Sequence, residues 1–250
     1  LEITLGAFVG LPLFCLWTSR EQVKEIFSSA LALTDSADGE EGNRLMSYRR
    51  AFWGAIFGFI LTWAFLVFFL KLNIFMSFIW LFLFYTTSMG MGRVRAEVGV
   101  PLQRTVGNRY EQIVFTGVLG GDRMGKGNMV STGYLAVFSY GGFGALAPLT
   151  LESYKLSDGI GLKRRSMSYA LMITVAFSTL IGFVFGLPLI YKYGAVNFPS
   201  WLVNPATRNV FRTLEFGRNF FKEPNYNRLI PILTGFLGVV FLGYMRSIFV

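Results

Sequence analysis

Two long apolar blocks without a charged side chain dominate the hydropathy pattern of the chain. They are Ala51–Leu70 and Leu72–Gly92, and only Lys71 separates them. Neither block shows a polar face at the 3.6-residue period of a surface helix. A helix rises about 1.5 Å per residue, so about twenty residues cross the roughly 30 Å hydrocarbon core of a bilayer. The blocks predict a transmembrane helical hairpin with a turn near Lys71–Asn73. The alternative, two buried helices of a large soluble core, is disfavoured by their length.

Three further apolar blocks extend this pattern. They are Ile3–Ser19, Ser166–Tyr191 and Leu229–Met245, and none of them contains a charged side chain. The first is short for a span and would be kinked by Pro12, whereas the second is long enough to tilt or to kink near Pro188. The chain is therefore predicted to be all-α: a polytopic transmembrane helical bundle with about five spans.

Another stretch, Tyr134–Leu151, is uncharged but interrupted. The interrupting residues are Gly141, Gly142, Gly144 and Pro148. A broken helix at membrane depth is tolerated where protein or a water-filled cavity surrounds the freed backbone, and transporters place substrates there. The stretch predicts either a kinked span or a re-entrant segment whose glycines line a cavity, and both alternatives stay open.

A glycine-rich segment, Gly117–Gly133, precedes this stretch. Within it, Gly120–Lys126 matches the G-x-x-x-x-G-K spacing of a phosphate-binding loop. The next residue is Gly127, where such a loop needs Ser or Thr to hold magnesium, and no strand–helix pattern surrounds it. We therefore expect a flexible or re-entrant segment here rather than a nucleotide site.

The polar segments connect the spans of what we expect to be a single transmembrane domain over residues 1–250. Residues 20–48 combine an amphipathic helix, about Arg20–Leu33, with the acidic loop Thr34–Asn43. This helix would lie at the membrane interface or pack on another soluble segment. Residues 196–228 would form an extramembrane connection. Because the chain opens and stops inside apolar segments, we expect it to be a piece of a longer protein.

Basic side chains predict the orientation of the spans. Arg20–Arg50, Arg93–Lys126 and Lys155–Arg165 contain several Lys and Arg residues each, whereas the hairpin turn contains only Lys71. The positive-inside rule then places the three basic segments, residues 20–48 included, in the cytoplasm and the turn outside. In this topology Tyr134–Leu151 has to return to the side on which it starts.

Composition narrows the classes of function. Hydrophobic residues make up 53% of the chain and charged residues 15%, with 27 Phe among 250 residues, which is typical of membrane proteins. The net charge of +9 comes from residues that flank apolar blocks, so we expect the lipid bilayer rather than nucleic acid as partner. A single cysteine and the absence of histidine disfavour a disulfide framework, a metal site and acid–base catalysis. We expect no cofactor and no enzymatic activity.

Two groups of residues are candidates for a role beyond the fold. Arg93, Arg95 and Glu97 alternate directly after a span. They are either a plain interfacial anchor or part of a polar transport path, which would also include Gly141, Gly142 and Gly144. Two G-x-x-x-G pairs, which favour close helix packing, are predicted to pack spans within the chain or, less readily, between copies. These pairs are Gly54 with Gly58 and Gly182 with Gly186.

Three stretches together resemble a known family. They are Leu45–Gly54, Gly92–Pro101 and Glu152–Leu156, the last leading into Lys163–Arg165 and the segment Tyr191–Ala195. Their order and spacing are similar to the C-terminal half of an uncharacterised prokaryotic family of polytopic membrane proteins, distantly similar to oligopeptide transporters. The R-x-R-A-E-x-G-x-P piece at Arg93–Pro101 is the most specific part. The resemblance implies a many-helix protein of the cytoplasmic (inner) membrane, without established functional residues.

Two functions follow as hypotheses. The first is a secondary transporter, or part of one, for a small solute such as a peptide or a metal chelate. It is motivated by the Gly- and Pro-broken apolar segments and by the sparse charges at the membrane border. The second is a non-catalytic structural subunit of a homo-oligomer or larger membrane complex, motivated by the few ionisable groups in the spans and by the many phenylalanines.

Overall fold

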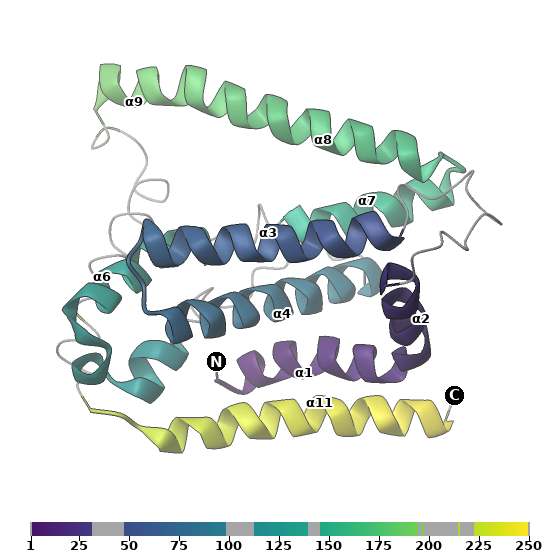
Figure 1. The fold of residues 1–250 in the computed structure, drawn as a ribbon, viewed down its shortest axis with the longest axis horizontal. Coiled ribbons are helices and arrows are strands. Elements are labelled where there is room, and N and C mark those ends of the chain that lie inside the picture. The colour runs from purple at the N-terminus through teal and green to yellow at the C-terminus, as the bar shows by residue number, and fades with distance from the viewer. Residues whose placement is uncertain are drawn as a thin grey trace.

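The computed structural model describes residues 2–31, 48–98, 113–139, 146–194, 197, 215 and 223–249. Every regular element within these residues is a helix (Figure 1). Four helical segments are long and apolar enough to cross a membrane, namely Arg49–Phe68, Ile74–Arg95, Arg164–Tyr193 and Tyr226–Arg246. A bent pair at the N-terminus raises this number to five if it is counted as one span. The structure therefore confirms an all-helical chain with several membrane-length helices, consistent with a helical bundle.

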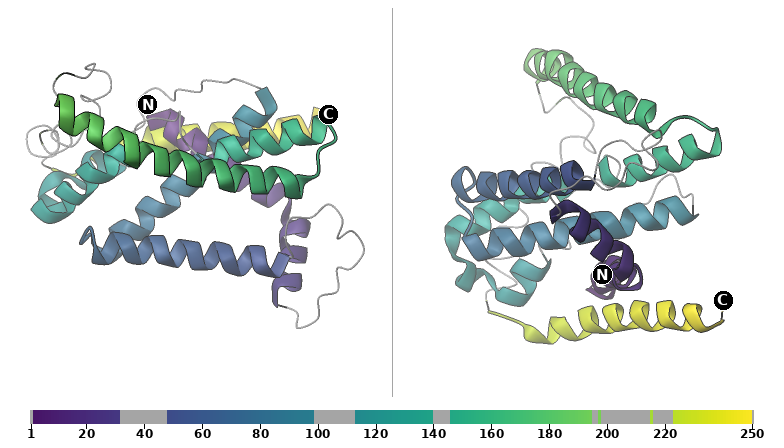
Figure 2. Two further views of the ribbon diagram at one scale, coloured as in Figure 1. Left: turned by 90° about the horizontal axis from the view of Figure 1, so that it is seen from above. Right: turned by 45° about the vertical axis from the view of Figure 1, so that its right-hand side comes forward.

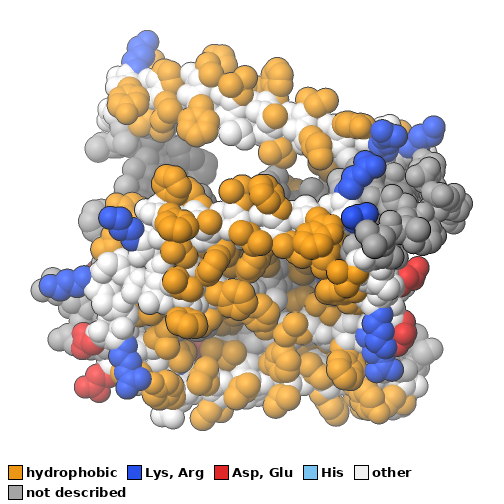
Figure 3. All heavy atoms as spheres, in the orientation of Figure 1, with side chains coloured by type: hydrophobic (Ala, Val, Ile, Leu, Met, Phe, Trp, Pro, Cys, Tyr) orange, Lys and Arg blue, Asp and Glu red, His pale blue; other side chains and the backbone are white. Residues whose placement is uncertain are grey.

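The surface of the bundle has the character of a membrane protein. Apolar side chains cover the middle of the face shown in Figure 3, and Lys and Arg side chains gather at its two ends. Phenylalanines on the two central helices point outward; the exposed fraction is 76% for Phe68 and 78% for Phe75. An exposed apolar belt between two charged rims is stable in lipid and unfavourable in water.

The predicted hairpin consists of α3 (Tyr48–Phe68) and α4 (Ile74–Val98). The chain reverses at Lys71, which has a positive φ of 52°. Asn73 then caps α4, because its Oδ1 accepts a hydrogen bond from the Phe75 N–H at 3.0 Å and its carbonyl accepts one from Ser77 Oγ at 3.0 Å. The turn lies where the sequence predicts it.

The N-terminal block folds as two helices bent by 70°, α1 (Glu2–Thr18) and α2 (Arg20–Leu31). The bend follows the change from an apolar to an amphipathic pattern at Arg20. Phe27 on α2 meets Phe52 on α3 edge-to-face, with ring centroids 5.0 Å apart. The first turns of α3 therefore lie beside α2. The acidic loop 34–43 lies outside the described residues.

The first and last helices pack against each other and run in the same direction (Figure 1). The last helix, α11 (Leu229–Phe249), follows a short 3₁₀ turn, η5 (Tyr226–Arg228). Glycines make the contact, because Cβ atoms built on Gly6 and Gly235 would each lie 1.9 Å from a carbonyl oxygen of the opposite helix. Only residues without a side chain allow two backbones to approach so closely.

The glycine-rich segment forms η1 (Ile113–Leu119) and α6 (Gly121–Ser139). It is interrupted where two glycines take positive φ values, 79° at Gly120 and 75° at Gly125. Its side chains enter the most buried part of the described bundle, a cluster built from α3, α4 and α6 and the turn between α3 and α4. The cluster comprises Leu66, Leu72, Trp80, Leu81, Met124, Met129 and Leu135.

The α6 helix also holds the hairpin turn in place. Asn128 Oδ1 accepts a hydrogen bond from the Asn73 N–H at 2.9 Å, and Ser131 Oγ donates one to the carbonyl of Leu70 at 2.5 Å. These contacts place α6 at the Lys71 end of the bundle. The prediction that Arg93–Lys126 lies on one side of the membrane is therefore wrong for its last part. The number of basic residues in a connection does not show whether that connection leads from one end of the bundle to the other.

The next helix, α7 (Leu146–Gly159), packs against α4 and reaches the opposite end of the bundle. The chain from Asn128 to Glu152 thus connects the two ends, so the prediction that Tyr134–Leu151 returns to its starting side is wrong. Such a return is needed only if the whole of the preceding basic segment, Arg93–Lys126, lies in the cytoplasm. Gly141, Gly142 and Gly144 lie outside the described residues, and so does most of the connection 196–228.

One long helical rod is set apart from the other helices in Figure 1 and in the right-hand view of Figure 2. It consists of α8 (Arg164–Ile181), the π-helical turn η2 (Gly182–Gly186) and α9 (Leu187–Tyr193). Along its most apolar stretch of 18 residues, no residue is buried within the described chain. Pro188 lacks the N–H that would bond to the carbonyl four residues earlier, and the π-helical turn accommodates this gap.

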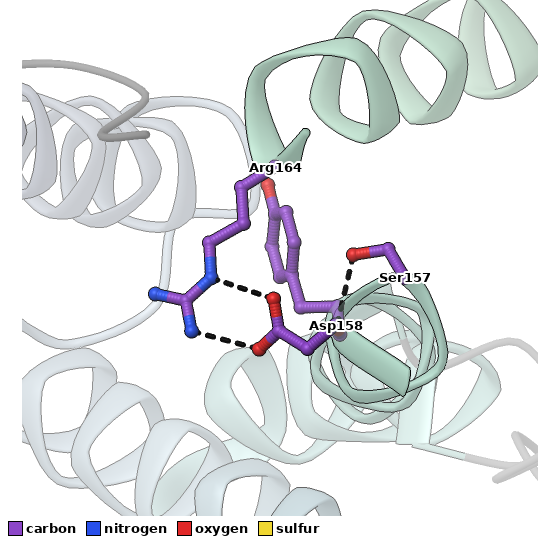
Figure 4. A network of polar contacts seen from close by, with 4 residues as sticks. Ser157, Asp158 and Arg164 are labelled. Carbon is purple, nitrogen blue, oxygen red and sulfur yellow. Dashed lines mark hydrogen bonds and ion pairs between the residues drawn. The ribbon is translucent and has the colours of Figure 1, made fainter. Parts of the chain in front are cut away.

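A polar corner joins this rod to α7 (Figure 4). Arg164 donates two hydrogen bonds to the Asp158 carboxylate, at 2.9 and 2.7 Å. Tyr154 and Ser168 share a hydrogen bond of 2.6 Å between their hydroxyls. Gly161, at a φ of 71°, turns the chain between the two helices. The corner fixes where the rod starts, although the rod itself has few neighbours.

Acidification should loosen this corner. The hydrogen bonds from Arg164, and then its positive charge, hold the pKa of Asp158 below its ordinary value of 3.8. A carboxylate with a depressed pKa stabilises the fold above its unfolded pKa, and this contribution is lost as the pH falls through the folded value. We expect weaker protection of the backbone around Gly161, measured as the exchange rate relative to the intrinsic rate at the same pH, below about pH 4, while the bundle stays folded. The effect is small because the pair is exposed.

The matched variant is Asp158→Asn, which should show the weaker protection already at pH 7 and no further loss of protection on acidification. Equal acid sensitivity of the corner in Asp158→Asn would show that another group titrates there.

Candidate functional site

The candidate residues at the end of α4 divide between two faces of the helix. Residues four apart share a face of a helix, whereas residues two apart do not. Accordingly, Arg93 Nε donates a hydrogen bond to Glu97 Oε1 at 3.0 Å, and these side chains are 47% and 49% exposed. Arg95 points the other way and its side chain is only 7% exposed. The three predicted residues therefore belong to two separate sites.

Arg95 ties α4 to α7. Its Nη2 donates a hydrogen bond of 2.7 Å to Oε2 of Glu152, whose side chain is 28% exposed. Partial burial strengthens such a pair relative to an exposed one, and it raises the cost of removing either partner. The sequence does not predict Glu152 as the partner, although Glu152 is the acidic residue that follows the uncharged stretch 134–151.

Arg93 and Glu97 face a cavity of about 530 Å³ at the same end of the bundle. It lies between α1, α4 and α11, and we refer to it as the α1–α4–α11 pocket. Its walls are mostly apolar, and its charged groups come from the last turns of α4 and α11. The lining residues are Leu11, Phe14, Cys15, Thr18, Ser19, Arg93, Glu97, Val239, Leu242, Gly243 and Arg246.

Neighbouring elements give the pocket its shape. The tight α1–α11 contact continues to its floor, where a Cβ on Gly243 would lie 2.5 Å from the ring of Phe14. Gly90 on α4 similarly allows α1 to approach, because a Cβ there would lie 2.7 Å from the carbonyl oxygen of Phe8. These close approaches bring α1, α4 and α11 together beside the pocket, which Arg93 and Arg246 also line.

A second polar cluster lies at the opposite end of the bundle. Arg228 Nη1 donates a hydrogen bond of 3.0 Å to Glu2 Oε1, and Arg123 Nη1 donates one of 2.6 Å to the Tyr226 hydroxyl. The Arg228 side chain also covers Gly117. These contacts join α1, η1, α6 and η5. Glu2 was not a candidate, although an acid at the start of an apolar helix is a usable signal for an ion pair.

Buried hydroxyls in the middle of the bundle serve the backbone. Thr86 and Thr87 donate hydrogen bonds of 2.7 Å to carbonyls one turn earlier on α4, and Thr132 does the same on α6 at 2.8 Å. A hydroxyl that donates a hydrogen bond to a carbonyl of its own helix already has a partner and needs no ligand to provide one. The α1–α4–α11 pocket is therefore the better candidate for binding.

The predicted packing glycines have no neighbour within the described residues. Apart from the backbone of the same helix turn and the adjacent residues, no described atom lies within 4 Å of a Cβ built on Gly54, Gly58, Gly182 or Gly186. Their role in helix packing stays a prediction, and it now requires a surface from outside the described chain. A different G-x-x-x-G pair, Gly6 with Gly10, makes the close contact with α11.

The sequence of the chain matches a known protein family. The model of the Family of unknown function (DUF6785) matches residues 2–250, almost the whole chain. The chain belongs to this family. No curated protein and no solved structure matches the chain in the same comparisons. Membership of DUF6785 assigns no activity, so a functional argument has to rest on the residues of the pocket and on the fold around it.

Proposed function

We propose that this DUF6785 member is a secondary transporter, or part of one, for a small solute. The observation that carries the proposal is the α1–α4–α11 pocket, which lies at the border of three apolar helices and presents both signs of charge. Its volume of about 530 Å³ falls in the usual range for small-molecule sites. Charged side chains of both signs that line a cavity between apolar helices are candidates for binding a solute.

Broken helices support this proposal. The glycine breaks at Gly120 and Gly125 divide η1 and α6 into short pieces beside the buried cluster. Transporters use such discontinuous helices at their moving parts, because glycine absorbs a change in backbone angles at little cost. In the proposed cycle Arg93, Glu97 and Arg246 hold the solute, and Arg95 acts as a positioning residue by tying α4 to α7.

Uptake by the reconstituted protein tests the proposal. Full-length protein in liposomes is offered labelled dipeptides and metal chelates, since a similarity to oligopeptide transporters is part of the proposal. We expect time-dependent uptake, and a loss of about tenfold in Glu97→Gln, because that variant removes one charged hydrogen-bonding partner. Glu21→Gln is the matched control, because Glu21 is an exposed carboxylate on α2 with a basic neighbour, Lys24, at 3.3 Å.

Two results would count against the proposal. Unchanged uptake in Glu97→Gln would remove that residue from the mechanism. Absence of uptake for every solute offered, from liposomes that contain folded protein, would favour another function.

A structural role in a larger complex is the second candidate, and the rod of α8, η2 and α9 favours it. No residue along its most apolar stretch of 18 residues is buried within the described chain. The exposed fraction is 63% for both Phe183 and Phe185. Gly182 and Gly186 lie open on this rod, where a helix of another subunit or a second copy fits. Co-purification with a stoichiometric partner, together with no uptake, would support this function.

A further inference from the structure

We infer that the α1–α4–α11 pocket binds an amphiphile with an apolar body and a single anionic head. The inference deepens the proposed transport function and rests on the same site. It goes further because it names the chemical class of the ligand from the charges and walls of the pocket.

The charged groups of the pocket leave one positive charge in excess. Among its lining residues, Arg93 and Arg246 are basic and Glu97 is the single acid. Arg93 and Glu97 neutralise each other at 3.0 Å. Arg246 is exposed and makes no ion pair within the described residues. A ligand with one negative charge therefore balances the site, whereas a cation or a dianion does not.

The walls favour an apolar body. Leu11 and Phe14 on α1 lie one turn apart, and Val239 and Leu242 on α11 also line the pocket. Each buried CH₂ group of a ligand contributes about 0.8 kcal/mol to binding. An acyl chain along these walls leaves its head at the level of Arg246, in the last turn of α11.

The location fits the same chemistry. The end of the pocket that carries Arg93 and Arg246 lies where two membrane-length helices finish, at Arg95 and Arg246. A molecule in this place has its tail at hydrocarbon depth and its head among the headgroups. Such a ligand comes either from solution, as a monocarboxylate with an acyl chain, or from the bilayer, as an anionic phospholipid.

Cys15 offers a direct readout, because it lines the pocket and is the only cysteine of the chain. The protein in neutral detergent is labelled with N-ethylmaleimide in the presence of decanoate, decanol or neither. A parallel arm uses liposomes of phosphatidylcholine with and without phosphatidylglycerol. We expect decanoate or phosphatidylglycerol to slow labelling at least about tenfold, and decanol to slow it far less.

Two variants make the assay specific. Arg246→Gln should remove the protection, measured as the ratio of labelling rates with and without ligand in the same variant. Arg50→Gln, an exposed arginine at the start of α3 that does not line the pocket, should keep the protection. Protection by decanoate assigns the dissolved source, and protection by phosphatidylglycerol alone assigns the bilayer.

Three results would overturn the inference: no protection by either anion, equal protection by decanol, or equal loss of protection in Arg50→Gln. Failure here is distinguishable from failure of the transport proposal, because labelling reports binding without uptake. Uptake of a solute together with no protection of Cys15 would reject the ligand class and keep the transporter. Protection without uptake would do the reverse.

Discussion

Gly6→Ala should destabilise the folded chain by about 2–3 kcal/mol, although alanine is the better helix former. The added Cβ would lie 1.9 Å from the carbonyl oxygen of Ile232 and 2.9 Å from the backbone nitrogen of Phe236. Backbone atoms cannot rotate away as a side chain does, so α1 and α11 have to separate. Thermal unfolding in detergent micelles, followed by the loss of monodisperse protein, measures the effect.

Gly58→Ala is the matched control, because Gly58 also belongs to a G-x-x-x-G pair in an apolar helix. No described atom lies within 4 Å of its Cβ position. Here we expect no loss of stability, or a gain of up to about 1 kcal/mol from helix propensity. The two substitutions are thus expected to differ in sign. Equal effects in both variants would mean that α1 and α11 do not approach as described.

Glu152→Gln should cost about 1–3 kcal/mol of unfolding free energy. The substitution leaves the buried guanidinium of Arg95 without its carboxylate at 2.7 Å, and a buried charge that loses its partner is expensive. The expected value stays below that of a fully buried pair because Glu152 is partly exposed. Detergent unfolding of Glu152→Gln measures this loss, and that of Arg95→Met, of Glu152→Leu and of the double variant that combines them measures the coupling between the two side chains.

Glu97→Gln provides the comparison, because it breaks an ion pair on the same helix at a similar distance. Both partners are about half exposed, so we expect a loss below about 1 kcal/mol. A double variant whose loss equals the sum of the two single losses would show that Arg95 and Glu152 act independently.

Hydropathy alone could predict the spans, but it could not predict which G-x-x-x-G pair packs against another helix. The hairpin is local: its two blocks are adjacent and its turn residue is the only charge between them. The pairs Gly6–Gly10 and Gly54–Gly58 have the same pattern, but only the first has a helix against it within the described chain. What separates them is the backbone of α11, which lies more than two hundred positions along the sequence from α1.

The residues of the α1–α4–α11 pocket likewise include some that the sequence could predict and others that it could not. Arg93 and Glu97 could be predicted as a polar pair, because charges directly after a span are visible in the sequence. The other walls of the pocket could not, since Cys15 and Arg246 come near them only through the packing of α1 and α11. The inward direction of Arg95 follows from helical spacing once α7 is known to cover that face.

The pairing of the first helix with the last has a consequence for biosynthesis. Glu2 and Arg228, which form an ion pair, are 226 positions apart. At about 5–20 residues per second, a ribosome makes the second partner roughly ten to fifty seconds after the first. During that interval the glycine face of α1 lacks its partner and is open to chaperones and to lipid. Contacts this distant in sequence also form slowly, so α1 stays exposed to cellular quality control until α11 has been made.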